Sequence, residues 1–520
     1  METRSESSAR PSQTTAHLVA VVFVLGVAGL VFSQTRSFGL LGMDTYPIIV
    51  TSRVESLADF WGTFSERLMD GFYPGGFYRP LLNLSFAVDY ALWGLRAPGY
   101  QLSNVLLFAG CALALYGLLI ACPGGRSPWA ALAGVLFFLF HPLLFEVVPY
   151  PPRRPELMCS MFMLLALAAE ARGGRSSRIW AALATLLALA SKETALILPA
   201  LVFCQALLYR PEGGWRSRGL RAVMAAARSA AVVTVFFAAR WWVLGGAGGH
   251  RHSVSLTEIA GDFPRILGSV LRTVTSPSSP GSWGPLLAWG ALSLLLLVAG
   301  VVEKRGAPSE GWAWFRSSLA VDGLFAASWL GILTAIFAAS GRLSPWYFVT
   351  AVVGFAILVS GLFDVLVTCF LSGRLIWRGT ALAATVAMVW LMASTQARWS
   401  PIVRTYDVWN QATDEYAAFL AQVEEAIAES EDGTLLRIPV PRKEALTDGQ
   451  ESLFRGVVHL ADYSLYAWAQ VTFPERHVRV LKNPKPLRTE PLQSTEVVVI
   501  LDRLATRIKR TRLAKGEGTP

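Results

Sequence analysis

The sequence has few charged residues for its length. Charged side chains make up 16% of the 520 residues, whereas 53% are hydrophobic. An ordinary soluble domain carries about 25% charged residues, so this composition excludes that class. The ten-residue alternation of apolar and polar positions that marks a membrane β-barrel is also absent. The composition therefore predicts an all-α polytopic membrane protein.

Cysteines and metal-binding patterns are scarce as well. The five cysteines form no Cys-x-x-Cys pair, and they fall inside or at the ends of apolar stretches: Cys111, Cys122, Cys159, Cys204 and Cys369. This excludes a disulfide framework and a thiolate metal site. His250 and His252 alone are too few for a metal centre, and no HExxH, GxSxG or glycine-rich phosphate loop occurs. We expect no cofactor, and nothing in the pattern supports a divalent metal.

Basic residues are concentrated in alternate short loops. About fifteen of them fall on one side of the predicted membrane: Arg4, Arg10, Arg126, Arg172, Arg175, Arg178, Arg210, Arg216, Arg218, Arg221, Lys304, Arg305, Arg316, Arg374 and Arg378. The positive-inside rule places this side in the cytoplasm. Anionic membrane lipids explain the net charge of +10 better than nucleic acid does, and no nucleic-acid partner is expected.

About eleven apolar stretches are candidate membrane spans. They comprise residues 17–32, 102–121, 129–148, 157–171, 179–190, 194–209, 223–244, 286–302, 319–339, 346–370 and 380–393. The fifth and sixth are short and flanked by arginine loops, so they form either two tilted helices or one re-entrant hairpin. The first lacks a signal-peptide cleavage site and is interpreted as an uncleaved helix. This topology places the N-terminus in the cytoplasm and the C-terminus outside.

Two long outer loops and a C-terminal region complete the expected organisation. Residues 1–396 form the transmembrane domain, whose first outer loop, 33–101, contains an apolar surface helix at 78–93. The second outer loop, 245–285, contains a surface helix near 259–274. Residues 397–520 are soluble in composition and predict a small extracytoplasmic α+β domain.

That domain is predicted in more detail from its local patterns. Helices are expected at 406–428 and 452–473. Strands are expected at 435–440, 478–481 and 497–501. A basic disordered tail is expected from residue 507 onward.

Asp44 is the first candidate for chemistry. It lies in the run Gly42-Met43-Asp44-Thr45-Tyr46, about a dozen residues beyond the first span. A carboxylate close to the membrane and to aromatic rings is suited to act as a general base. The alternative interpretation is a solvated loop aspartate.

Further ionisable residues flank later spans on the same predicted side. They are His141, Glu146, Arg153, Arg154, Glu156, Lys192, Glu193 and Arg342. Snorkelling explains a single arginine or lysine at a span end, but it does not explain glutamates and a histidine on the same rim. Cations there suit an anionic phosphate, with the acids orienting them. For Trp346 beside Arg342, packing in an aromatic belt is the alternative.

Several motifs resemble those of C-type (GT-C) glycosyltransferases. They match the O-mannosyltransferase part of transmembrane-and-tetratricopeptide proteins and their bacterial relatives, over roughly residues 40–200. The stretches are Phe77-Tyr78-Arg79-Pro80-Leu81, Asp89-Tyr90-Ala91-Leu92-Trp93-Gly94-Leu95, Gly99-Tyr100-x-x-Ser103-Asn104, His141-Pro142, Glu146, Arg154-Pro155-Glu156 and Ser191-Lys192-Glu193. Two features depart from the family: Met43 stands where a second acid is common, and tetratricopeptide repeats are absent.

The resemblance implies an inverting glycosyltransferase of the cell inner membrane. It would move a sugar from a polyprenyl-phosphate donor to an acceptor hydroxyl on the extracytoplasmic face, with Asp44 as general base. Arg154, Lys192 and Arg342 would bind the donor phosphate. Supporting roles fall to Arg79, His141, Glu146, Arg153, Glu156 and Glu193. The acceptor, whether protein, lipid or glycan, stays open, as does the sugar.

Two other classes of function compete with this interpretation. One is a non-enzymatic transporter or flippase of lipid-linked saccharides, although the sequence has no internal repeat of the kind many transporters show. The other is a catalytically inactive membrane scaffold. Sugar transfer from a lipid-phosphate donor distinguishes the enzyme from both.

Overall fold

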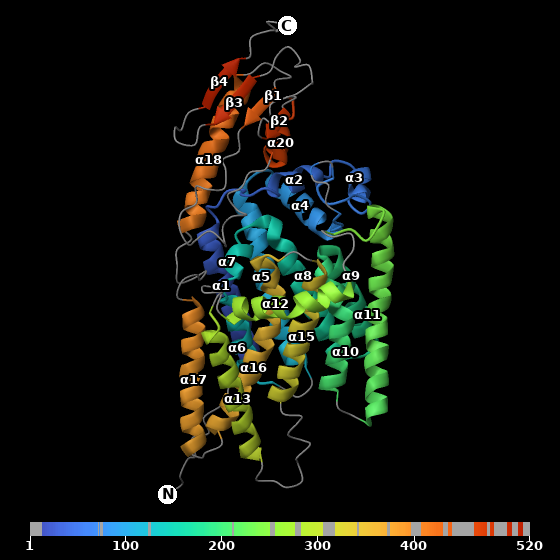
Figure 1. The fold of residues 1–520 in the computed structure, drawn as a ribbon, viewed down its shortest axis with the longest axis vertical. Helices are drawn as coiled ribbons and strands as arrows, with labels where there is room; N and C mark the ends of the chain where they lie inside the picture. Colours follow the sequence, from blue (N-terminus) through green and yellow to red (C-terminus); the bar gives the residue numbers. More distant parts are fainter. Residues whose placement is uncertain are drawn as a thin grey trace.

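A computed structural model describes most of the helical part of the chain. The residues described are 13–70, 72, 76–122, 126–210, 213–249, 255–275, 282–304, 318–340, 343–371, 375–396, 407–429, 435–438, 462–475, 479–482, 497–501 and 508–512. Long helices run side by side along the longest axis, and the C-terminal elements lie at one end of this bundle (Figure 1).

A helix overlaps each of the eleven predicted spans. These helices are α1 Gln13–Thr35, α5 Ala97–Ala121, α6 Pro128–Leu139, α8 Arg154–Arg172, α9 Arg175–Ser191, α10 Leu198–Tyr209, α11 Trp215–Leu244, α13 Gly284–Lys304, α15 Ser318–Ser340, α16 Val349–Leu371 and α17 Leu375–Gln396. Within the described residues, five helices (α1, α5, α11, α15 and α16) are long and apolar enough to cross a membrane. The protein is therefore a multi-pass helical membrane protein, and a count of eleven crossings stays a prediction.

The third predicted span is shorter than expected. Residues 129–148 do not form one helix: α6 ends at Leu139, and the short α7 (Leu144–Val147) follows after His141-Pro142. Proline has no backbone N–H and disfavours helical geometry in the residue before it, which explains the break. The break places His141 and Glu146 in a folded connection at the end of the bundle.

The short fifth and sixth stretches form two separate helices. α9 ends at Ser191, and Lys192 has an extended backbone with φ −162° and ψ 144°. The 3-10 helix η2 (Glu193–Ile197) and α10 follow directly. Lys192 and Glu193 thus lie at the bend between two helices.

Aromatic and small residues fill the interior of the bundle. Phe108, Phe138, Phe325 and Trp329 are fully buried. Where α6 meets α16, a Cβ on Gly134 would lie 2.6 Å from the carbonyl oxygen of Ala356, so the two backbones approach closely only because this residue is glycine.

Four shorter helices lie across or beside the long ones. α2 (Thr45–Thr51), α3 (Leu57–Gly62) and α4 (Pro80–Trp93) lie at the end nearest the C-terminal elements, and α12 (Leu256–Thr275) crosses the bundle below them (Figure 1). α4 and α12 confirm the helices predicted at 78–93 and 259–274. α12 buries Ile266, Val270 and Val274, which recur at a spacing of four residues and form one apolar face.

The C-terminal elements combine helices with short strands. They are α18 (Asp407–Ala428), α20 (Asp462–Thr472), β1 (Leu435–Ile438), β2 (Arg479–Lys482), β3 (Val497–Leu501) and β4 (Ile508–Arg512). β1 pairs with β2 in parallel, Leu435 opposite Arg479, and β3 pairs with β4 antiparallel, Val497 opposite Arg512. β4 lies where a disordered tail was predicted from residue 507, so that prediction is wrong for residues 508–512. Part of the predicted helix 452–473 lies outside the described residues.

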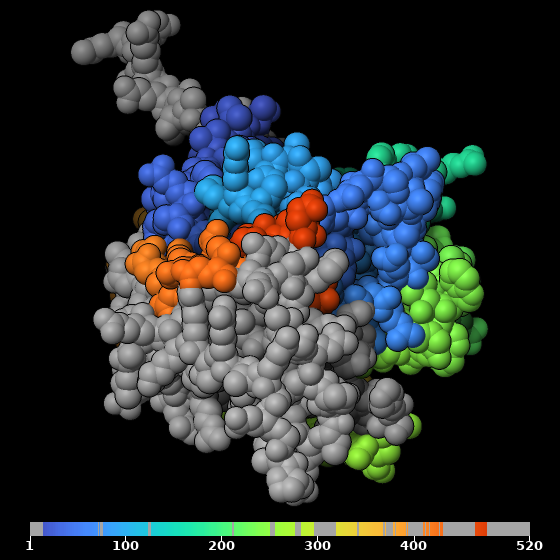
Figure 2. Space-filling view, turned by 90° about the horizontal axis from the view of Figure 1, so that it is seen from above, coloured from blue at the N-terminus to red at the C-terminus, as the bar shows by residue number. Residues whose placement is uncertain are grey.

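The C-terminal helices pack on the first outer loop and on α7. Trp409 of α18 contacts Phe38 and Phe145, with ring centroids 6.0 and 6.1 Å apart. Leu465 of α20 is buried in the same apolar cluster. Seen from above, α18 and α20, in orange and red, lie beside the blue N-terminal segments (Figure 2). Whether residues 397–520 form an independent domain stays a prediction.

Candidate active site

Nine of the ten predicted site residues lie at one end of the bundle, where α2, α4 and α8 begin and α9 ends. They are Asp44, Arg79, His141, Glu146, Arg153, Arg154, Glu156, Lys192 and Glu193. The tenth, Arg342, lies outside the described residues, as do His250 and His252.

Arg79 and Glu193 form a two-pronged ion pair. Arg79 precedes Pro80 at the start of α4, and its Nε and Nη2 donate to the two carboxylate oxygens of Glu193 at 3.1 and 2.6 Å. The side chains are 15% and 30% exposed. The pair leaves Nη1 of Arg79 for a further acceptor, so this is the cation most open to a ligand.

Lys192 is paired with Glu156 in a more buried position. The Lys192 ammonium contacts Oε1 of Glu156 and lies 4.2 Å from the ring centroid of Tyr347. Both side chains of the ion pair are almost entirely buried. Oε2 of Glu156 is buried and has no hydrogen-bond partner among the residues described. Lys192 is thus held by one carboxylate oxygen and one aromatic face.

Arg153 is held by a carboxyl group and by two aromatic rings. Its Nη1 donates to the carbonyl oxygen of Glu146 at 2.8 Å and to Oε2 of the same residue at 3.3 Å. The guanidinium carbon lies 3.8 Å from the ring centroid of Trp346 and 5.0 Å from that of Tyr150. Burial raises the pKa of the Glu146 carboxyl to about 8, and the neighbouring Arg153 opposes this shift.

Tyr150, Trp346 and Tyr347, with Arg153 and Lys192 on their faces, are named the aromatic layer here. Trp346 and Tyr347 belong to the 3-10 helix η3 (Pro345–Phe348), and their rings pack edge to face with centroids 5.7 Å apart. The layer therefore joins the Arg153 and Lys192 ion pairs into one structure. Trp346 could lie in an aromatic belt, as the alternative interpretation has it, and still contact the Arg153 guanidinium.

Asp44 reaches this layer through Tyr150. Any Cβ on Gly42, whose φ is +87°, would lie 2.3 Å from the Tyr150 hydroxyl, so only glycine lets the Asp44 loop pass over the ring. The Tyr463 hydroxyl, from α20, donates to Oδ1 of Asp44 at 3.1 Å, and Ser464 donates to the carbonyl oxygen of Met43. The carboxylate is thus oriented from the C-terminal region, which argues against a freely solvated loop aspartate.

Arg154 is saturated by its neighbours. Nε donates to Asn104 Oδ1 at 2.9 Å, Nη2 to Asp89 Oδ2 at 2.6 Å and to the Tyr100 carbonyl at 3.4 Å, and Nη1 to both oxygens of Ser85. These five bonds match the five N–H donors of a guanidinium. Arg154 therefore ties α4, α5 and α8 together and has no donor left for a phosphate, in contrast to its predicted role.

His141 is a neutral structural histidine. Its Nε2 lies 2.8 Å from the carbonyl oxygen of Val274, which only accepts, and its Nδ1 accepts from the Leu143 backbone N–H at 3.2 Å. Nε2 therefore carries the proton. Burial lowers the pKa of the imidazole to about 4. His141 anchors the end of α12 and takes no part in proton transfer near neutral pH.

The cluster combines several cations with several acids. Four cations lie close together, because Arg240 of α11 also interacts electrostatically with Glu193. They face the carboxyls of Glu146, Glu156 and Glu193, and the carboxylate of Asp44 acts on Tyr150 in the same layer. Guanidinium and ammonium groups gathered in this way suit a phosphate group. The described residues include no group of three or more His, Cys, Asp or Glu side chains that could hold a metal.

Sequence reasoning missed the partners that fix these groups. Asp89 and Asn104 stood in quoted motifs without a role, and Tyr463 and Ser464 lie about 420 residues from their partners along the chain. Arg240 could have been noticed, because a cation inside the apolar stretch 223–244 is costly to place in a membrane.

The helices and the charged cluster define a multi-pass membrane protein with a polar site at one end of its bundle. No family model matches the chain. The chain is 35% identical over 126 residues to the mouse (Mus musculus) protein O-mannosyl-transferase TMTC2, covering 24% of this chain and 14% of that protein. It is 33% identical over 131 residues to human (Homo sapiens) TMTC4, covering 23% and 17%. With Drosophila melanogaster Tmtc1 it shares 34% identity over 194 residues, covering 36% and 21%.

Part of the chain is therefore homologous to the TMTC protein O-mannosyl-transferases, and the matched segments span about a fifth or less of those relatives. Among solved structures, ArnT from Cupriavidus metallidurans bound to undecaprenyl phosphate aligns over 88% of this chain and 89% of its own. Identity is 15% and the TM-score is 0.44.

Proposed function

We propose that the protein is an integral-membrane glycosyltransferase of the GT-C type. In this proposal it moves a sugar from a polyprenyl-phosphate donor to an acceptor hydroxyl on the extracytoplasmic face of the cell inner membrane. The observation that carries the proposal is the aromatic layer, which connects the carboxylate of Asp44 to a cluster of cations at one end of the bundle. The partial homology to proteins named O-mannosyl-transferases supports it.

The donor phosphate would bind at the open side of the cation cluster. Arg79 offers Nη1 and is the most exposed of the paired cations, and Lys192 lies nearby at the bend between α9 and η2. Arg342 stays a candidate because it precedes η3, which carries Trp346 and Tyr347. Arg153, Glu156 and Glu193 would orient these groups. The polyprenyl chain would lie against the apolar helices, where it is soluble.

The reaction would use Asp44 as general base. The acceptor hydroxyl gives its proton to Asp44 while its oxygen attacks the anomeric carbon from the face opposite the phosphate. The bond between that carbon and the phosphate oxygen breaks, the phosphate leaves with the electron pair, and the configuration inverts. General-base assistance is worth about 10²- to 10⁴-fold. Cations that stabilise the charge on the departing phosphate remove the need for a general acid.

The orientation of Asp44 fits this role. The Tyr463 hydroxyl donates to Oδ1 of Asp44 and thereby holds the carboxylate from the side of α20. Because Tyr463 belongs to α20, the C-terminal region would form one wall of the acceptor site. We propose that this region lies on the extracytoplasmic side of the membrane and the N-terminus in the cytoplasm, as the basic loops predict.

Reconstitution tests the proposal against the transporter and the inactive scaffold. The full chain in vesicles is supplied with a radiolabelled polyprenyl-phosphate mannose, chosen from the names of the relatives, and with hydroxyl-bearing peptide, lipid and glycan acceptors. An enzyme forms a labelled acceptor. A flippase moves the label across the bilayer without forming product, and a scaffold does neither. Movement of the labelled donor across the bilayer, with no labelled acceptor of any class, would contradict the enzyme and favour the transporter.

A further inference from the structure

A buried arginine near the end of α11 connects the two outer loops. Arg240 is 5% exposed and lies within the apolar stretch 223–244. Its Nε donates to the carbonyl oxygen of Ala247 in the second outer loop at 3.1 Å, and its Nη2 donates to that of Gly76 in the first outer loop at 3.2 Å. Because a buried guanidinium is costly unless its donors are used, these contacts indicate a specific use for this side chain.

The carbonyl oxygen of Gly76 also accepts a second hydrogen bond from the second outer loop. The backbone N–H of Gly249 donates to it at 2.8 Å, and the two glycines form an antiparallel β-bridge. Gly248 has a φ of +67°, and a Cβ on it would lie 2.4 Å from the Gly76 oxygen and 2.9 Å from Nη2 of Arg240. Only glycine therefore lets the two loops approach this closely. The position of Gly76 is thus set by α11 and by the loop that follows it.

Gly76 begins the short segment that ends at Arg79, the most exposed of the paired cations in the candidate site. Within this segment, the Phe77 ring lies under the Arg79 guanidinium, whose carbon is 4.8 Å from the ring centroid. Tyr78 packs on Phe236 of α11, with ring centroids 5.6 Å apart. The segment is therefore held against α11 by hydrogen bonds at its start and by ring packing in its middle, and movement of Gly76 would shift Arg79.

Arg240 also acts on the ion pair at the end of this segment. It attracts the carboxylate of Glu193 and repels the guanidinium of Arg79. Arg79 donates to both carboxylate oxygens of Glu193, so a shift of either partner changes the direction of its remaining group, Nη1. Arg240 thus influences Arg79 through the backbone of the segment and through the shared carboxylate.

We propose that Arg240 is a positioning residue for donor binding, which holds Arg79 in place through Gly76. The inference rests on the proposed function in taking a polyprenyl phosphate as the ligand of Arg79. Arg240 itself has no contact with the donor in this proposal, because its Nε and Nη2 are used by the two loops.

Direct binding of a polyprenyl phosphate tests this role whether or not sugar is transferred. The full chain in detergent is titrated with undecaprenyl phosphate, and the affinity is measured by thermophoresis. Arg240→Met removes the guanidinium, so the affinity should fall about tenfold, as expected for losing a hydrogen bond from a charged donor. Wild-type affinity in Arg240→Met would overturn the proposal.

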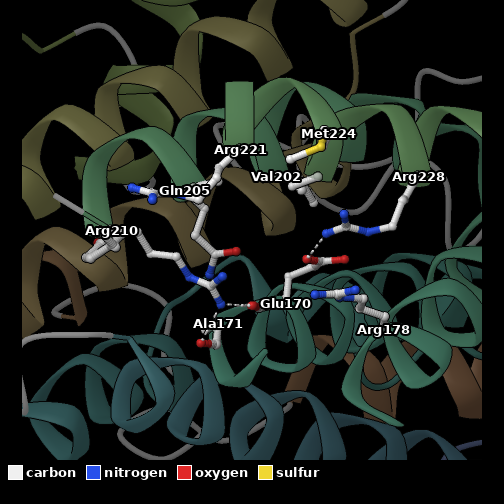
Figure 3. A pocket seen from close by; sticks show the side chains of 12 residues that line it. Glu170, Ala171, Arg178, Val202, Gln205, Arg210, Arg221, Met224 and Arg228 are labelled. Carbon is white, nitrogen blue, oxygen red and sulfur yellow. Dashed lines mark hydrogen bonds and ion pairs between the residues drawn. The ribbon is translucent and has the colours of Figure 1, made fainter. Parts of the chain in front are cut away.

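Arg228→Gln is the matched control on the same helix. Arg228 pairs with Glu170 at 3.0 Å, and its side chain is 42% exposed (Figure 3). Exposed ion pairs contribute little, so the affinity of this variant should stay within about twofold of the wild type. Equal losses in Arg228→Gln and Arg240→Met would mean an unspecific effect of charge and would contradict the positioning role.

A second variant separates position from charge. Gly248→Ala keeps Arg240 but places a methyl group against the Gly76 oxygen, so it should weaken binding about as much as Arg240→Met does. Gly246→Ala is its control, because a Cβ there would have no atom within 4 Å, and it should bind as the wild type does. Wild-type affinity in Gly248→Ala would mean that the charge alone matters and would contradict positioning through Gly76.

Coupling to Arg79 is the sharpest test. If Arg240 acts through Arg79, then Arg79→Lys and Arg79→Lys/Arg240→Met should bind undecaprenyl phosphate equally weakly, whereas independent effects multiply. Multiplied losses would overturn the proposal. In the transfer assay, Arg240→Met should raise the donor KM and leave kcat unchanged, and a fall in kcat without a change in KM would indicate a merely structural role. A protein that shows this binding pattern but transfers no sugar would end the proposed function and leave the role of Arg240 intact.

Discussion

Two polar regions lie next to each other at one end of the bundle and differ in how fully their donors are used. In the network around Arg154, every N–H of the guanidinium has an acceptor, and the side chain is 1% exposed. Around the aromatic layer, Nη1 of Arg79 donates to no acceptor among the described residues. Oε2 of Glu156 likewise has no hydrogen-bond partner in the described part of the chain. Saturated polar groups hold helices together, whereas incompletely satisfied ones are available to a ligand. The first region should therefore govern stability and the second activity.

The largest expected effect is on the saturated network. Arg154→Met leaves Asp89 buried without its cation, and removing one partner of a buried ion pair costs about 3–5 kcal/mol. The free energy of unfolding, measured by denaturant titration in detergent, should fall by that amount. Arg154→Met/Asp89→Asn should recover part of it, because the uncompensated charge is gone. An Arg154→Met protein with wild-type stability and impaired donor binding would reverse the roles of the two regions.

Gly42→Ala tests the contact between the Asp44 loop and the aromatic layer. The new Cβ would overlap the Tyr150 hydroxyl at a positive φ, and such backbone strain costs about 1–3 kcal/mol. We expect transfer to fall by at least tenfold, because the loop must move away from Tyr150. Gly29→Ala, in an open part of α1, is the matched control and should behave as wild type in the same transfer assay.

Arg79→Lys tests the open donor of the second region. Lysine keeps the charge but loses the two-pronged contact with Glu193 and the free Nη1, so the KM for the donor should rise about tenfold, or about 1.4 kcal/mol. Arg53→Lys, at a surface pair with Glu55, should leave the KM unchanged. A donor KM that stays the same in Arg79→Lys would remove Arg79 from phosphate binding.

The smallest effect is expected for Tyr463→Phe. This substitution deletes one hydrogen bond to Asp44, typically worth about 0.5–1.5 kcal/mol. As a positioning residue, Tyr463 should affect kcat, by about two- to tenfold, and leave the donor KM unchanged. A donor KM that rises while kcat stays constant would assign Tyr463 to donor binding instead.

The helices could be predicted from the sequence, but the ion pairs and hydrogen bonds between side chains could not. Apolar runs of 12 to 25 residues indicate helices whatever surrounds them, and His141-Pro142 even marks the break that the prediction overlooked. The pattern could not tell that Arg154 meets Asp89, because which acid meets which base depends on how α4 and α8 pack. The contact between Tyr463 and Asp44 joins distant segments and has no local signal. The sequence therefore pointed to residues that gather at one end of the bundle, but of the three cations that it assigned to the phosphate, Arg154 has no N–H donor left.

The central claim is that Asp44 removes the acceptor proton, and one measurement tests it directly. Transfer from a polyprenyl-phosphate sugar is followed in vesicles for the wild type, for Asp44→Asn and for Asp70→Asn, an exposed acid in the same loop. Asp44→Asn should lose about 10²- to 10⁴-fold in kcat with donor binding retained, and Asp70→Asn should match the wild type. A wild-type rate for Asp44→Asn would contradict the mechanism.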